Sequence, residues 1–284
     1  MATAAEVLRG LVLAQAGDEA DWVAESLDRL AAGAPERDLH IFLGLAPRRL
    51  GKSDMALTEA DLAAAEAARP GWRLEGWSTD GAARVLALLV HGRNRPFSEL
   101  FKDLRRTADA AELVALYRGL PLYPDPARLD FEVGEGLRSN IRAVFEAIAH
   151  NNPYPREQFD EHRWNHMVLK ALFVGSRLAP IDGLDARANP ELARILHEYA
   201  HERWAAGRPV TPELWRCVGP FAVNEPALAD LARALSEGGA ATRAAALALT
   251  ASPAPTARNL LAGRPEAAAI AAGALTWQTL GEAA

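Results

Sequence analysis

Residues 224–252 read NEPALADLARALSEGGAATRAAALALTAS, and this stretch indicates the architecture. Asn224 offers a side-chain acceptor at a helix start, and Pro226 stands in the first turn, where its missing N–H costs nothing. The pattern predicts helices over 224–237 and 240–252, with Gly238 and Gly239 between them. Helices this short are not stable alone, so each buries an apolar stripe against a neighbour. The stretch therefore predicts a stacked helix pair.

The rest of the chain shows the same pattern of short helices with capping residues at their ends. Thr58 and Thr211 are further helix starts, and Gly207 followed by Pro209 ends a helix. The apolar run 39–45 could be a strand, but no partner strand is near it in the sequence, so we predict a helix. The remaining helical patterns cover residues 2–16, 18–32, 37–46, 58–69, 79–92, 96–106, 108–119, 133–150, 155–177, 187–206, 211–218, 254–263 and 265–281.

These patterns predict an all-α protein of stacked antiparallel helix pairs. The small residues and tight turns of the C-terminal third are typical of a HEAT-like α-solenoid, although no fixed repeat period is present. We expect a single all-helical domain over 1–284, made of N-terminal helices at 1–132, a central part at 133–219 and HEAT-like helices at 220–284.

Composition excludes several classes of function. The net charge of -6 and the absence of a concentrated cationic face argue against nucleic acid as a partner. The single cysteine, Cys217, cannot form an internal disulfide. No long apolar run could span a membrane, and the first residues lack the pattern of a signal peptide. We expect a cytoplasmic protein with no direct membrane insertion.

His197-Glu198-Tyr199-Ala200-His201 is a literal H-E-x-x-H within a predicted helix. In zinc peptidases the two histidines bind the metal and the glutamate activates a water molecule. Glu225 is the nearest candidate for a third ligand. Charged neighbours surround the motif, so we interpret it as a surface helix and expect no cofactor, with a zinc site at His197, His201 and Glu225 as the alternative.

Residues 150–177 carry polar groups next to an apolar pattern. On a helical wheel, His162, Asn165 and His166 share a face with Leu169, Leu172 and Phe173, which we take as the core stripe. Buried polar groups need partners, so these side chains either hold the preceding turn or line a ligand pocket. The candidate ligand-binding residues in this segment are His150, Asn152, Tyr154, His162, Asn165, His166 and Lys170.

A third group lies at 187–216, where arginine and tryptophan gather near one helix corner. Such residues either brace the corner or hold an anionic ligand through cation–π and bidentate contacts. The candidates in this group are Arg187, Asn189, Arg203, Trp204, Glu213, Trp215 and Arg216.

Several strings in the same region resemble the EboA family: HNNPYP at 150–155, WNHMVLKALF at 164–173, RANPELAR at 187–194, ERWAAGRP at 202–209 and PELWR at 212–216. The resemblance implies a cytoplasmic helical protein of bacterial secondary-metabolite gene clusters, which are associated with moving precursors toward the periplasm. It implies no established catalytic residues.

We therefore predict a non-catalytic binding or scaffold protein, with pathway enzymes or a small metabolite as partners. A metal-dependent hydrolase using the motif at 197–201 is the alternative. An enzyme that uses His162, Asn165 and His166 on an aromatic or prenylated precursor is a third possibility.

Overall fold

The computed structural model describes residues 2–91 and 95–281, and these residues are mostly helical with no β-strand among them. The only pairing of extended backbone in these ranges is an isolated bridge between Asp54 and Ser78. The prediction of an all-α protein is confirmed, and the apolar run 39–45 lies in a helix. The last residue of the predicted helix 79–92 lies outside the described residues.

The chain divides into two compact units, residues 1–159 and 160–284. The helices of the first unit are α1 (Ala4–Gln15), α2 (Ala20–Ala31), α3 (Glu36–Arg49), α4 (Glu59–Ala68), α5 (Thr79–His91), α6 (Phe97–Thr107), α7 (Ala110–Arg118), α8 (Asp130–Leu137), α9 (Arg142–Ala149) and α10 (Tyr154–Gln158). Those of the second are α11 (Glu161–Phe173), α12 (Pro190–Ala205), α13 (Trp215–Val218), α14 (Glu225–Ser236), α15 (Gly239–Ala251), α16 (Pro255–Leu261) and α17 (Pro265–Ala271).

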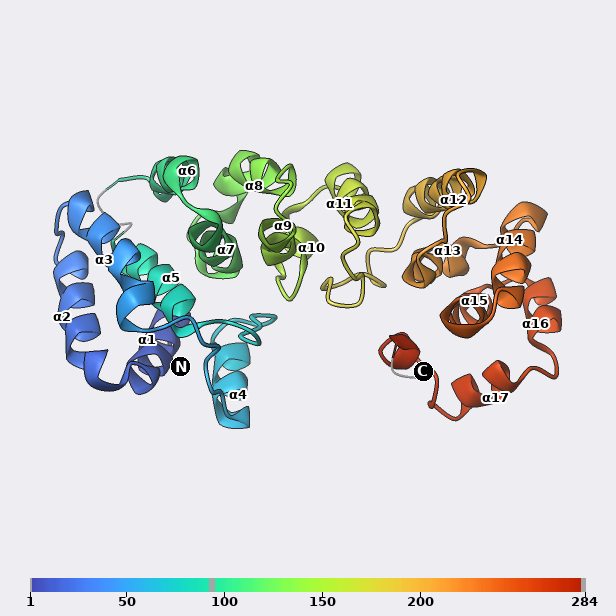
Figure 1. Ribbon diagram of the computed structural model, residues 1–284, viewed down its shortest axis with the longest axis horizontal. Coiled ribbons are helices and arrows are strands. Elements are labelled where there is room, and N and C mark those ends of the chain that lie inside the picture. The colour runs from blue at the N-terminus through green and yellow to red at the C-terminus, as the bar shows by residue number, and fades with distance from the viewer. Residues whose placement is uncertain (1, 92–94, 282–284) are drawn as a thin grey trace. The chain divides into compact units, whose positions relative to one another are not determined.

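Helix α5 is the centre of the first unit. It packs against α1, α2, α3 and α7 (Figure 1). The run from Ala82 to Leu88 is buried throughout. The buried Arg84 donates to the Leu43 carbonyl at 3.1 Å and lies 3.6 Å from Asp80. These contacts supply the partners that a charge needs in an apolar interior.

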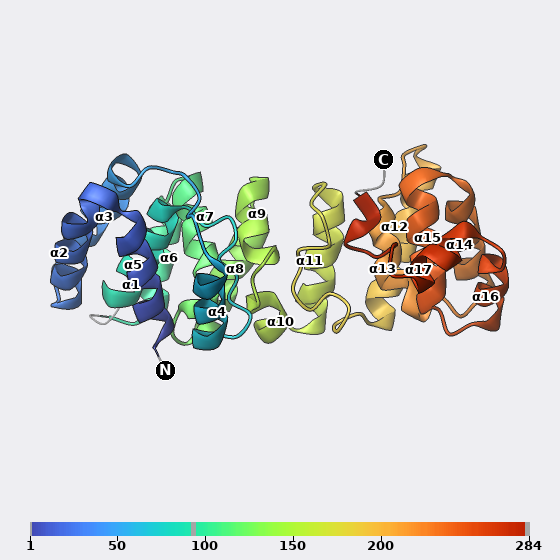
Figure 2. The same cartoon turned by 90° about the horizontal axis from the view of Figure 1, so that it is seen from below.

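Helix α15 has the same position in the second unit, where α13, α14, α16 and α17 pack against it (Figure 2). Its buried run, Ala244 to Leu249, is mostly alanine, so neighbouring backbones can approach closely. A close approach occurs at Gly219, at the start of a 3₁₀ turn (Gly219–Phe221) that lies against α15.

Two predicted helices are each divided in two. The pattern at 133–150 contains α8 and α9, with a break at residues 138–141, where Ser139 Oγ accepts from the Ile141 N–H. The pattern at 155–177 contains α10 and α11, because Asp160 accepts from the Arg163 N–H and starts a new helix. A side chain that caps a new helix competes with continuation of the old one.

Asn224 caps α14 as predicted, accepting a hydrogen bond from the Ala227 N–H at 3.0 Å. We expect Asn224→Ala to lower the free energy of unfolding by about 1 kcal/mol, because one backbone donor loses its partner. Urea denaturation followed by circular dichroism measures this. Glu202→Ala, on the exposed face of α12, is the control and should change stability by less than about 0.5 kcal/mol. Equal stability of the two variants would contradict the assignment of the cap.

Candidate functional site

The histidines of the H-E-x-x-H motif lie on one face of α12. His197 is half-buried and His201 is exposed, and their ring centroids are 4.8 Å apart. Residues four apart in a helix are neighbours on its surface, which brings the two Nε2 atoms together. Asn189 caps this helix by accepting from the Leu192 N–H at 2.8 Å, and α12 packs against α13.

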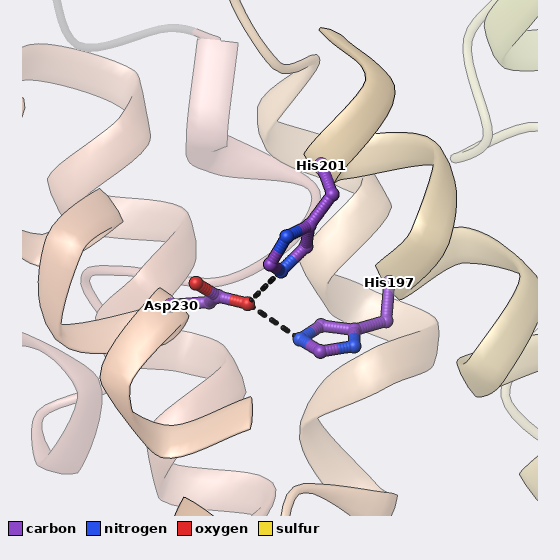
Figure 3. Close-up of side chains that lie close together, drawn as sticks. All are labelled: His197, His201 and Asp230. Atoms are coloured by element: carbon purple, nitrogen blue, oxygen red, sulfur yellow. Dashed lines mark hydrogen bonds and ion pairs between the residues drawn. The ribbon is translucent and has the colours of Figure 1, made fainter. Parts of the chain in front are cut away.

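Asp230 of α14 completes this cluster, as Figure 3 shows. Its Oδ2 atom lies 2.5 Å from Nε2 of both His197 and His201. The three potential ligand atoms all lie within 4.8 Å of one another. We name His197, His201 and Asp230 the His–His–Asp cluster.

Asp230, and not Glu225, is the acidic residue beside the histidines. Glu225 is exposed and outside the one His/Cys/Asp/Glu group of three found in the described chain. Five residues at 100° each place it about 140° away from Asp230 around α14. Sequence reasoning missed Asp230, although it stands at the edge of the buried stripe that contains Ala227 and Leu231.

The glutamate of the motif has other contacts. Glu198 is 61% exposed and forms an ion pair with Arg194 at 2.5 Å, and Arg194 also contacts Glu191. Glu198 therefore belongs to the charged outer face of α12, as the sequence indicates. On the other side of the His–His–Asp cluster, Trp204 packs edge-on against His201 with a centroid distance of 5.8 Å.

The predicted core face of α11 is correct for Asn165 and Leu172, which are buried, and wrong for the two histidines and Phe173. His162 and His166 do share a face with Phe173, but all three are exposed, and Phe173 is 76% exposed. The buried residues of the helix are Trp164, Asn165, Met167, Val168, Ala171 and Leu172. The apolar stripe therefore consists of Trp164, Met167, Val168, Ala171 and Leu172, and the two histidines lie on the opposite side of the helix.

Of these polar residues, Asn165 alone is buried in α11. Its amide exchanges hydrogen bonds with Asn189, at 2.9 and 3.2 Å. The pair joins α11 to the start of α12. Lys170 is half-buried, and burial lowers the pKa of its ammonium group.

Asn152 holds the turn at 150–154 itself. Its side-chain amide donates to the carbonyls of Tyr117 and Ala147, both at 3.0 Å, and its oxygen accepts from the Tyr154 N–H. The Tyr154 hydroxyl donates to the Pro126 carbonyl at 2.8 Å. All of these contacts lie within the first unit.

The arginine and tryptophan residues of 187–216 contact other side chains or the backbone. Arg216 forms a bidentate ion pair with Asp185 at 2.6 Å for each bond. The Arg187 guanidinium lies over the Trp164 ring at 4.7 Å, and Trp204 packs beside Trp215. Arg203 Nε donates to the Pro209 carbonyl, and the Glu213 carboxylate accepts from the Leu178 N–H. These contacts favour bracing of the corner over the binding of an anion.

Two adjoining pockets lie in the first unit, and both are lined by Trp77, Val114 and Arg118. One measures about 240 Å³ and reaches Lys52 and Asp80. The other measures about 190 Å³, and its remaining lining residues are Glu75, Ala143, Glu146, Ala147, His150, Asn151 and Asn152. We name the two together the Arg118 pocket. It brings in His150 and Asn152 of the predicted site, whereas sequence reasoning missed Trp77 and Arg118.

Arg118, the last residue of α7, is the distinctive charge of this pocket. Its guanidinium donates to the Gly76 carbonyl, and among the described residues no carboxylate lies within ion-pairing distance. Burial lowers the pKa of the Arg118 guanidinium, and the charge of Asp54 raises it in part. By contrast, Arg69, Arg84 and Arg105 in the same unit each have a carboxylate partner. Arg118 thus presents a partly desolvated positive charge to the pocket.

The structure defines an all-helical protein with a polar cluster between two helices in one unit and a pocket around an arginine in the other. The sequence model described as metabolite traffic protein EboA matches residues 5–219, and the chain belongs to the EboA family. The matched range includes the Arg118 pocket and both histidines of the His–His–Asp cluster, but not Asp230. No curated protein and no solved structure matches the chain. No helix of the described ranges is both long and apolar enough to cross a membrane.

Proposed function

We propose that the chain is a non-catalytic binding protein that takes part in metabolite traffic by holding a small acidic metabolite in the Arg118 pocket. The family description supports a role in metabolite traffic. The observation that carries the proposal is the Arg118 guanidinium, which lies in a pocket without a carboxylate partner. In this proposal the protein acts in the cytoplasm with enzymes of a secondary-metabolite or precursor-export pathway, and its helix pairs stack as a HEAT-like α-solenoid.

The pocket suits a ligand with an apolar body and an acidic end. Trp77 is almost fully buried and Val114 is half-buried, so an aromatic or aliphatic group finds apolar contacts beside them. A carboxylate or phosphate group would form charge-assisted hydrogen bonds with Arg118. Such a ligand would restore the electrostatic stabilisation that the guanidinium loses on burial.

A matched pair of small probes tests the acidic end. We expect benzoate and phenyl phosphate to bind wild-type protein in calorimetric titrations, and benzamide, which has nearly the shape of benzoate but no charge, to bind at least about 10-fold more weakly. Arg118→Gln should weaken the binding of the two anions by a similar factor and leave benzamide unchanged.

Arg106→Gln is the control, because Arg106 is exposed at the end of α6 and lines neither pocket. Its affinities should equal those of the wild type. Equal binding of benzoate and benzamide would contradict the proposal. Unchanged anion binding by Arg118→Gln, or no binding of either anion to folded wild-type protein, would also contradict it.

The metal-dependent hydrolase remains a second candidate, since two histidines and an aspartate do gather at the motif. The ion pair between Glu198 and Arg194 counts against it, because the glutamate that would activate water is held on the outer face of α12. The substitution Glu198→Gln distinguishes the two candidate functions. A hydrolase would lose its activity, whereas a binding protein would keep its affinity for benzoate.

A further inference from the structure

We propose that the His–His–Asp cluster binds one divalent metal ion of the zinc type, with the fourth coordination position open. The proposal concerns the second unit and does not rest on the Arg118 pocket. It replaces the expectation of no cofactor, and it assigns the third protein ligand to Asp230 instead of Glu225.

The donor set is the first support. Two imidazole nitrogens and one carboxylate oxygen are the protein ligands of many open zinc sites, in which water or a ligand takes the fourth position. In this cluster both nitrogens are Nε2, and both are directed at the same atom, Oδ2 of Asp230 (Figure 3). Convergence of three donors from two helices is what a metal site requires.

The distances are the second support. Bonds of about 2.0–2.1 Å to a tetrahedral ion separate neighbouring ligand atoms by about 3.3 Å. Each histidine nitrogen lies 2.5 Å from the aspartate oxygen, so an ion would need each pair to separate by less than about 1 Å. Small rotations of the half-buried His197 and Asp230 side chains and of the exposed His201 would provide this separation.

The charges around the cluster are the third support. Asp230 is 15% exposed and has no lysine or arginine within ion-pairing distance in the described chain, so its negative charge faces the two histidines. Two arginines of α12 and α14 have other partners. Arg194 contacts Glu191 and Glu198, and the Arg233 guanidinium lies over the Trp204 ring at 3.9 Å. A divalent cation would balance the charge of Asp230 and bind both imidazole nitrogens at the same time.

Access and chemistry define what the site can do. His201 is 56% exposed, so an ion and a further ligand can enter from solvent on this side. Glu198, the glutamate that would act as general base in a hydrolase, is instead paired with Arg194. We assign the site a binding role, in which the ion holds α12 to α14 and offers its open position to a donor atom from outside.

Titration with the metal alone tests the site. Untagged protein, freed of metal with a chelator, should bind one equivalent of Co²⁺ and show the visible absorption of four-coordinate cobalt, and Zn²⁺ should displace it. His201→Ala and Asp230→Asn should each weaken Zn²⁺ binding by at least about 10-fold. Circular dichroism and melting of the metal-free variants establish that they are folded. If Asp230→Asn does not fold, the variant His201→Ala still tests the site, because His201 is exposed.

The matched control is the other histidine pair of the same unit. His162 and His166 are also four apart in a helix, with ring centroids 4.3 Å apart, but they belong to no such group of potential ligands in the described chain. His166→Ala should leave the affinity for Zn²⁺ unchanged. Absence of saturable Co²⁺ or Zn²⁺ binding to folded wild-type protein overturns the proposal and leaves the cluster as hydrogen bonds alone. Unchanged affinity in His201→Ala, or loss of affinity in His166→Ala, overturns it as well.

Discussion

Gly219→Ala is expected to lower the free energy of unfolding by about 3 kcal/mol or more, which is at the upper end of the losses that overpacking of a core causes. A Cβ atom at this position would lie 2.5 Å from the Ala248 carbonyl oxygen and 2.7 Å from its Cα. Both are backbone atoms of α15, the centre of the second unit, so relief requires a shift of the whole helix. The φ of -49° at Gly219 suits alanine, so the loss is purely steric.

Thermal melting measures this loss, and we expect the melting temperature to fall by about 6–12 °C. Gly10→Ala is the control, because Gly10 lies within α1 and a Cβ there meets nothing within 4 Å. Without steric conflict, alanine should stabilise that helix by about 0.5–1 kcal/mol. The two substitutions should therefore change the free energy of unfolding in opposite directions. A Gly219→Ala protein as stable as the wild type would refute the close approach of Gly219 to α15.

Asn152→Ala is expected to lower the free energy of unfolding by about 2–4 kcal/mol, because it removes the side-chain hydrogen bonds of three buried backbone groups. The groups are the carbonyls of Tyr117 and Ala147 and the N–H of Tyr154. They belong to α7, α9 and the first residue of α10, so one small side chain joins three segments of the first unit. Urea denaturation measures the loss.

Asn152→Asp refines the test, since it keeps the acceptor for the Tyr154 N–H but places an oxygen against the two carbonyls. The carboxylate form is disfavoured there, so the pKa of Asp at this position should be raised above its unfolded value. With a raised folded pKa, the stability of this variant should fall as pH rises above about 4.

Asn151→Gly is the control for both variants. Asn151 is exposed and has a φ of 50°, a conformation that glycine adopts without strain. The free energy of unfolding of Asn151→Gly should therefore differ from that of the wild type by less than about 0.5 kcal/mol. If Asn152→Ala were no less stable than Asn151→Gly, the hydrogen bonds of Asn152 would not hold the turn.

The position of the site residues shows where helical periodicity succeeds and where it fails. It correctly places His197 and His201 together, and it groups His162 with His166. It does not determine which side of α11 is buried, because that depends on which neighbours cover Trp164 and which leave Phe173 in solvent. Asp230 and Arg118 were missed for a related reason: their surroundings come from segments tens of residues away in the sequence.

The amino-acid sequence by itself determined the local features of this protein: the all-helical class, helix starts such as Thr58 and Asn224, and the helix end at Gly207, which has a φ of 65°. These depend on the backbone and on side chains three or four residues apart. The tertiary structure alone decided the pairing of α12 with Asp230 of α14, the Arg118 pocket and the close contact of Gly219 with α15. Each of these depends on packing between helices, whose register and spacing are set by the shapes of many side chains at once.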